Sequence, residues 1–289
     1  LHKLLSECLQ LDCFSLDTPD GLIDAYGVGD TALAVFPAGS RFLSKGKPGV
    51  DHLAFAAKNT DEAASLLIDD AKHSIGINGM EQIQIPGELT QGVFSRFSPM
   101  TDLRGNSTKF VERMDHIGIA SNSNIIAESI FSGKLGLPVE SRQTDMEVKV
   151  SMESFTSDKY GVIYKTRPPE TMGGLRVSFI TIGDTELEFL ENFNDQHRAE
   201  ITHGTPGNTK QDQGAITKYV DKYGPGLHHL AFKTPDINQT LKHLEKHNFK
   251  LIDTIGREGS RRSLIGFIHP ASTGGVLIHF VEREEIIDA

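Results

Sequence analysis

Polar and apolar residues alternate in several short segments of this chain, and three of these segments share one pattern. Residues 50–57 (VDHLAFAA), 114–121 (MDHIGIAS) and 227–234 (LHHLAFKT) each place a histidine after an apolar and a polar residue. Alternation with a period of two is typical of a strand that buries one face. The pattern therefore predicts three related strands, each carrying a histidine near its start.

Two further pairs of segments repeat along the chain. Residues 29–37 (GDTALAVFP) resemble 183–191 (GDTELEFLE), and residues 109–114 (KFVERM) resemble 279–284 (HFVERE). The second half contains the full order of histidine strand, GDT strand, histidine strand and FVER strand, and the first half has the same order without its opening strand. We therefore predict two related domains, residues 1–113 and 114–289, with the first strand of the former apparently missing.

Helices are predicted between these strands, because apolar residues recur at helical spacing after Asp, Asn or Thr, which cap helices. The remaining segments, residues 72–107 and 144–175, are expected to be strands with loops, and the latter is expected to set the size of any cavity. The chain is thus predicted to have an α+β fold. The expected helices cover residues 1–11, 60–70, 124–135 and 236–248.

Side chains alternate between the two faces of a strand, so the predicted strands direct particular polar residues to one side. Four strands of the second half would aim His116, Glu188, His229 and His279 at a common cavity. A single strand histidine is more often a hydrogen-bonded core residue than a ligand. Four matching placements favour a site for one divalent metal ion, for which imidazole and carboxylate suit Fe, Mn, Co, Ni or Zn.

The first half offers an internal comparison. Alignment of the repeats places Ala34 where Glu188 stands and Lys109 where His279 stands, and retains His52. Alanine cannot bind a metal, and a lysine ammonium repels one. The first domain is therefore predicted to be metal-free and structural, with His52 as a packed or exposed remnant.

Composition narrows the function and the location. The 289 residues carry a net charge of −10, which argues against nucleic acid or an acidic membrane surface as a partner. No apolar run is long enough to span a bilayer. Two cysteines cannot build a disulfide framework, so a reducing, cytoplasmic location is expected. A monomer and a homodimer both remain open.

These motifs together resemble the vicinal oxygen chelate superfamily, which includes glyoxalases, bleomycin-resistance proteins and dioxygenases. Residues 114–285 are most similar to methylmalonyl-CoA epimerases, through MDHIGIA, GPGLHHLAFKTPDI and IGFIHPASTGGVLIHFVE. The resemblance implies tandem βαβββ modules that form two cupped mixed sheets flanked by helices. It also implies that His116, Glu188, His229 and His279 hold the metal. At His279 the family places glutamate, which it also uses for proton transfer.

Three functions are compatible with this resemblance. The first is an isomerase or epimerase that polarises a carbonyl or acyl-thioester (CoA-like) substrate, bound through its oxygens, and moves an α-proton. His279 is then the candidate base and Glu170 a second one. The second is an Fe(II) dioxygenase of the extradiol or 4-hydroxyphenylpyruvate dioxygenase type. The third is a non-catalytic, ligand-sequestering protein of the bleomycin-resistance type.

Other polar residues have weaker indications. Residues 256–262 (GREGSRR) supply Arg257, Arg261 and Arg262 as candidate ligands for a substrate phosphate or carboxylate. His228 is expected to face away from the cavity and to pack. His269 precedes a proline and is expected to be structural.

Overall fold

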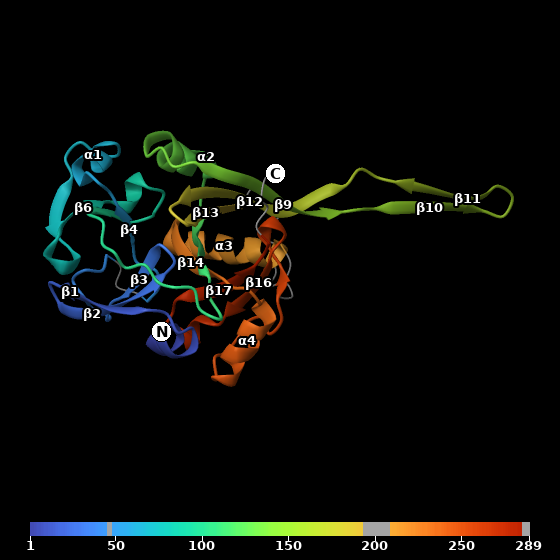
Figure 1. The fold of residues 1–289 in the computed structure, drawn as a ribbon. Coiled ribbons are helices and arrows are strands. Elements are labelled where there is room, and N and C mark those ends of the chain that lie inside the picture. Colours follow the sequence, from blue (N-terminus) through green and yellow to red (C-terminus); the bar gives the residue numbers. More distant parts are fainter. Residues whose placement is uncertain (45–47, 193–208, 285–289) are drawn as a thin grey trace.

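The computed structural model describes residues 1–44, 48–192 and 209–284, and it has a mixed α+β fold (Figure 1). Its largest sheet has eight strands in the order β15-β16-β17-β14-β8-β13-β12-β9. These strands are β8 (Arg113–Ser121), β9 (Val139–Lys149), β12 (Glu170–Ile182), β13 (Thr185–Asn192), β14 (Gly226–Lys233), β15 (Arg257–Glu258), β16 (Leu264–Ile268) and β17 (Leu277–Glu282).

The first half of the chain forms two smaller sheets. One has the order β1-β2-β3 and the other the order β4-β7-β6-β5. Their strands are β1 (Cys13–Thr18), β2 (Gly21–Val28), β3 (Thr31–Val35), β4 (Leu53–Ala56), β5 (Lys72–Ile75), β6 (Glu81–Ile85) and β7 (Ser95–Ser98).

The two halves differ because of one strand. In the second half, β8 pairs in parallel with β13 and antiparallel with β14, and so joins two modules into one sheet. Among the described strands none takes this place in the first half, so β3 and β4 stay in separate sheets. The two expected sheets are thus present as one continuous sheet in the second half and as two separate smaller sheets in the first half. The domain boundary at residue 113 stays a prediction.

Helices occur where the sequence predicts them. Asn59, Ser123 and Asp236 each accept a backbone N–H bond as helix caps. None of the helices in the described part of the chain is long and apolar enough to cross a bilayer. The predicted helices are η1 (Lys3–Cys8), α1 (Thr60–Ser65), α2 (Asn124–Glu128) running into η4 (Ser129–Lys134), and α4 (Ile237–Lys246); the short turns are η2 (Ile77–Gly79), η3 (Gly87–Leu89), η6 (Ser260–Arg262) and η7 (Pro270–Ser272).

One helix was not predicted from the sequence. α3 (Thr209–Tyr223) packs on the large sheet, where Ile216 joins a buried cluster with Leu175 and Phe179. Few of its residues are apolar, and much of its surface is polar. α3 forms one wall of the cavity described below.

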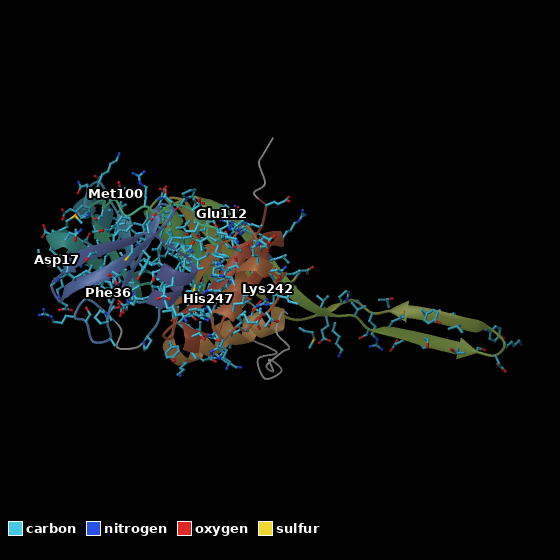
Figure 2. The ribbon with its side chains drawn as sticks, turned by 60° about the horizontal axis from the view of Figure 1, so that its bottom comes forward. Asp17, Phe36, Met100, Glu112, Lys242 and His247 are labelled. Atoms are coloured by element: carbon cyan, nitrogen blue, oxygen red, sulfur yellow. The ribbon has the colours of Figure 1, made fainter. Side chains whose placement is uncertain are left out.

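A long hairpin extends from the large sheet. β9 and β12 continue into β10 (Met152–Ser157) and β11 (Gly161–Thr166), which pair only with each other among the described sheets and project away from the body (Figure 1). Side chains fill the body densely, whereas those of the hairpin stand apart from it (Figure 2). Most of residues 144–175 therefore cannot set the size of a cavity, contrary to expectation.

Candidate metal centre

His116 and His279 belong to one row of residues that crosses three strands. His116 on β8 is opposite Ala231 on β14, and Ala231 is opposite His279 on β17. The methyl side chain of Ala231, which lies between the two histidines, leaves room for both rings to lean together. The curvature of the sheet then brings their Nε2 atoms to 3.1 Å.

A second row, two residues further along β8, is built in the same way. Glu188 on β13 is opposite Gly118 on β8, and Gly118 lies opposite His229 on β14. A Cβ atom at Gly118 would approach the ring atoms of His229 to 2.0–2.3 Å. Only glycine therefore leaves space for the imidazole of His229 to lie over the sheet beside His116.

The two rows converge on one point. His116 Nε2 lies 3.3 Å from His229 Nε2 and 3.3 Å from Glu188 Oε2, and Glu188 Oε2 is also 3.3 Å from His229 Nε2. All four residues are 4% exposed. The structure thus brings together the four residues that the sequence predicted as metal ligands.

Hydrogen bonds alone do not account for this geometry. His116 Nε2 has three polar neighbours, but a ring nitrogen carries either one proton or one lone pair. A cation with bonds of 2.0–2.1 Å would place its ligand atoms about 3.0 Å apart in octahedral and about 3.4 Å apart in tetrahedral geometry. The observed separations of 3.1–3.3 Å fall within that range, so the three imidazoles fit a divalent metal, with Glu188 beside two of them.

Burial and neighbouring charges set the protonation of the cluster. Burial lowers the pKa of His229, and burial and the adjacent imidazoles hold that of His279 well below its usual range. For Glu188, burial opposes ionisation, but His116 and His229 outweigh it and hold its pKa well below the usual range. Burial would lower the pKa of His116, but the carboxylates of Glu188 and Asp115 raise it to about 9. Without a metal, His116 is therefore protonated at neutral pH and its charge is balanced by the ionised Glu188.

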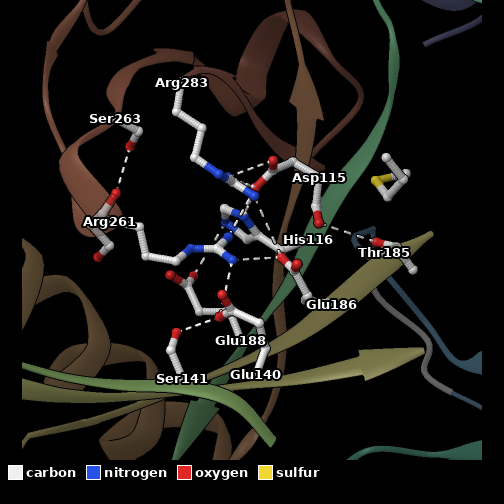
Figure 3. A network of polar contacts seen from close by, with 12 residues as sticks. Asp115, His116, Glu140, Ser141, Thr185, Glu186, Glu188, Arg261, Ser263 and Arg283 are labelled. Atoms are coloured by element: carbon white, nitrogen blue, oxygen red, sulfur yellow. Dashed lines mark hydrogen bonds and ion pairs between the residues drawn. The ribbon is translucent and has the colours of Figure 1, made fainter. Parts of the chain in front are cut away.

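A second layer of charges lies behind His116 (Figure 3). His116 Nδ1 lies 2.7 Å from Asp115 Oδ1, so the carboxylate accepts the ring N–H and orients the ring with Nε2 towards the cluster. Asp115 is fully buried, and it also accepts bonds from Arg261 and Arg283. Sequence analysis missed Asp115, although it precedes the histidine in the repeated DH pair.

The cluster lies in a cavity of about 450 Å³. Arg257 and Arg261 line it, as predicted for substrate ligands, whereas Arg262 is exposed and is not part of the lining. Arg257 forms ion pairs with Asp212 and Asp253. Asp212 comes from α3 and also lines the cavity, and burial raises its pKa.

Arg261 also forms ion pairs with carboxylates of the protein. It pairs with Asp115 and Glu186, and its guanidinium lies 3.7 Å from the centre of the Phe179 ring. Arg257 and Arg261 are therefore each already compensated by a buried carboxylate, Asp253 and Asp115 respectively. Their role as substrate ligands stays a prediction.

His228 differs from the expectation. It lines the cavity, and its Nδ1 lies 3.0 Å from Nδ1 of His229. The register of β14 against β8 shifts between Leu227 and His229, which breaks the alternation that placed His228 on the other face. Burial and the neighbouring His229 lower the pKa of His228 to about 3. His269 agrees with the prediction, since its Nδ1 accepts the Ala271 N–H and caps η7.

Glu170 does not lie near the cluster. It begins β12 in the hairpin, where it is exposed and is opposite Lys149. Phe179, the partner of Glu188, is nine residues further along β12, which is about 30 Å at roughly 3.3 Å per residue. The structure therefore does not bring Glu170 to the site as a second base.

The first half corrects the internal comparison. Ala54 on β4 is opposite Arg96 on β7, just as Ala231 is opposite His279, so Arg96 and not Lys109 takes the position of His279. Arg96 is 3% exposed, and its guanidinium lies 4.0 Å from the centre of the Phe42 ring. His52 is packed and bonds to Asp51, as His116 does to Asp115. A guanidinium thus occupies the place where a metal would require a ligand.

Comparisons with known proteins show the family of this chain. The model of the Glyoxalase/Bleomycin resistance protein/Dioxygenase superfamily matches residues 115–267, more than half of the chain. The chain belongs to this superfamily. The matched residues include His116, Glu188 and His229, whereas His279 follows the matched segment.

Curated relatives of this superfamily member include the uncharacterized protein YqjC of Bacillus subtilis. It is 28% identical over 60% of this chain and 93% of its own length. The mitochondrial methylmalonyl-CoA epimerase of Dictyostelium discoideum is 25% identical over 38% of this chain and 57% of its own length. Among solved structures, methylmalonyl-CoA epimerase from Mycobacterium tuberculosis covers 62% of this chain and 93% of its own, at 23% identity and a TM-score of 0.41.

Proposed function

We propose that this protein is a metal-dependent isomerase or epimerase that moves a proton next to the carbonyl of a small acyl-thioester or related oxygen-chelating substrate. The observation that supports it is the convergence of His116, Glu188, His229 and His279 within a cavity of about 450 Å³. Three imidazoles and one carboxylate leave about two positions of a six-coordinate Fe, Mn, Co, Ni or Zn ion for substrate oxygens.

The charge of the donor set supports this chemistry. One carboxylate among four ligands leaves a divalent ion with a net charge near +1, so the bound ion would polarise a substrate carbonyl and acidify the neighbouring C–H bond. The chain's own residues would exclude water and handle the proton. Phe179 and Phe267 line the cavity with apolar surface beside the cluster.

His279 is the proposed proton-transfer residue. Its ring is buried in the cavity wall, and its Nδ1 has no hydrogen-bond partner among the described residues. Its depressed pKa keeps the ring neutral, and the ring would act as a base through Nε2 when that atom does not hold the metal. Asp212, which the sequence did not suggest, is a further carboxylate on the cavity wall and is paired with Arg257.

The relatives support an acyl-thioester as the substrate class. Several are methylmalonyl-CoA epimerases, and the chain spans about half to three fifths of the length of those curated epimerases. The family glutamate at the position of His279 is replaced here, which favours a substrate that differs from that of the epimerases.

The decisive test is exchange of substrate protons with solvent. Protein stripped of metal and reloaded with one ion at a time is incubated in D2O with a panel of α-branched acyl-CoA thioesters and α-hydroxy ketones. We expect deuterium at the α-carbon, and a loss of at least about 100-fold in rate for His229→Ala. His73→Ala, an exposed imidazole on β5, is the matched control and should retain the wild-type rate.

Two other results would replace the proposal. Stoichiometric iron with oxygen consumption on catechols or 2-oxo acids, and without deuterium exchange, would identify a dioxygenase. Tight ligand binding without any turnover would identify a sequestering protein. His279→Glu, which restores the family's residue, should increase proton exchange on acyl-CoA substrates, and an unchanged rate on every substrate would count against the isomerase.

A further inference from the structure

A second cluster of metal-binding side chains lies at the boundary between the first and second halves. One ligand atom from each of Cys8, His243 and His247 lies within 4.8 Å of the others. Among the described residues, only this group and the three histidines of the main site meet that criterion. Cys8 ends η1, and the two histidines are one helical turn apart at the end of α4.

Backbone carbonyls define the tautomers of both imidazoles. His243 Nε2 lies 3.1 Å from the carbonyl oxygen of Cys8, and His247 Nδ1 lies 2.9 Å from that of His243. A carbonyl only accepts, so each of these nitrogens carries the proton and the other ring nitrogen keeps its lone pair. Metal-binding histidines in proteins are held by N–H bonds of this kind.

The surroundings hold these residues in place. Phe110 stacks on His243 with ring centres 4.0 Å apart, and Cys8 is fully buried. Leu4 and Leu5 of η1 belong to the same buried core as Leu241 and Leu244 of α4. The two helices are therefore packed together before any ligand binds, which reduces the reorganisation that binding requires. His247, labelled in Figure 2, is partly exposed and leaves a path for an ion.

We propose that Cys8, His243 and His247 form a second metal site, separate from the main cluster, that binds a borderline-soft divalent cation, with Zn²⁺ the best match. Thiolate and imidazole are the ligands that zinc prefers, and a water would complete the fourth position. The bound ion would link η1 of the first half to α4 of the second. The site would stabilise the contact between the halves and take no part in the reaction.

Cobalt distinguishes the two sites by their ligands. The main cluster offers nitrogen and oxygen only, whereas Cys8 adds a sulfur, so thiolate-to-cobalt charge transfer in the near ultraviolet reports the second site alone. Reduced, metal-free protein is titrated with Co²⁺ and then with Zn²⁺ under chelator competition. We expect two ions per chain, with the charge-transfer band lost on addition of Zn²⁺.

Variants assign the band to residues. Cys8→Ser and His247→Gln should abolish it and lower the Zn²⁺ stoichiometry from two to one, with at least about a 100-fold loss of affinity at this site. Cys13→Ser, which removes the other cysteine, and His229→Ala, which disrupts the main cluster, should both keep the band. Circular dichroism and thermal unfolding confirm that each variant is folded.

Three outcomes would overturn the proposal. The first is wild-type protein that binds cobalt at the main cluster but shows no charge-transfer band. The second is a band that survives Cys8→Ser, and the third is a band that disappears with Cys13→Ser. Any of them would leave the two histidines as hydrogen-bonded packing at the end of α4. The proposed isomerase function would be unaffected, because the main cluster shares no residue with this site.

Discussion

The Nε2 atoms of His116 and His279 lie 3.1 Å apart, although 163 residues separate them in the chain. This contact depends on Ala231, which lies between them in the same row of the sheet. The same arrangement, with Gly118 as the small residue, brings Glu188 and His229 together. Two rows with a small central residue therefore build the candidate metal centre, and changes in or behind these rows have predictable effects.

Asp115→Asn should weaken metal binding by about 10–100-fold, because a neutral amide is a poorer acceptor for the N–H bond that orients His116. The change also removes one counter-charge of the partly buried Arg261 and Arg283, which keep Glu186, so the unfolding free energy should fall by less than the about 3–5 kcal/mol of an uncompensated buried charge. Chelator competition and chemical denaturation measure the two effects. Asp51→Asn is the matched control, since it removes the equivalent carboxylate beside His52 and should leave metal affinity unchanged. Equal affinities in both variants would show that Asp115 does not position His116.

Gly118→Ala should abolish metal binding at the main cluster, because the new methyl group would occupy the space of the His229 ring. Equilibrium dialysis of the purified variant against Zn²⁺ or Co²⁺ gives the number of bound ions. Gly133→Ala in η4 is the control, since its nearest neighbour, the carbonyl oxygen of Glu128, is 3.9 Å away. Full binding in Gly118→Ala would mean that His229 reaches the metal from another position.

His52 should make the protein less stable in mild acid. Burial lowers its pKa in the folded protein, so below about pH 6.5 the unfolded chain binds a proton that the folded chain does not. The unfolding free energy should therefore decrease as the pH is lowered, by up to about 1.4 kcal/mol per pH unit for this one group. His52→Asn should reduce that slope between pH 6.5 and 5, measured by urea denaturation, and His73→Asn serves as the exposed control. A slope that is unchanged in His52→Asn would show that His52 takes up its proton in the folded state.

Replacing residues 150–168 with a short glycine-containing turn should leave the metal centre intact. Within the described part of the chain, strands β10 and β11 pair only with each other, and their large apolar side chains are exposed, including Met152 at 66% and Tyr164 at 66%. We expect the same metal stoichiometry, a thermal midpoint within a few degrees and less self-association in analytical ultracentrifugation. A loss of metal binding would indicate that the hairpin supports the cavity.

The sequence was sufficient to place the four candidate metal ligands on one face, because each lies in a segment with a clear period of two. Alternation predicted that His116, Glu188, His229 and His279 point to one face, and all four do so. It failed at His228, where a register shift breaks the period, and at Glu170, which lies on a strand that extends beyond the sheet. It also failed at Arg96, since the similarity of KFVERM and HFVERE suggested a different strand for the first half.

Residue order alone therefore determined the superfamily, the elements and the face on which each ligand stands, because these follow from local periodicity and from repeats. Only the tertiary structure decided which of these residues meet, since contacts between distant strands depend on register, sheet curvature and the small residues Gly118 and Ala231. The buried partnership of Asp115 with two arginines, and the approach of Cys8 to α4, arise from packing between segments that no local pattern connects.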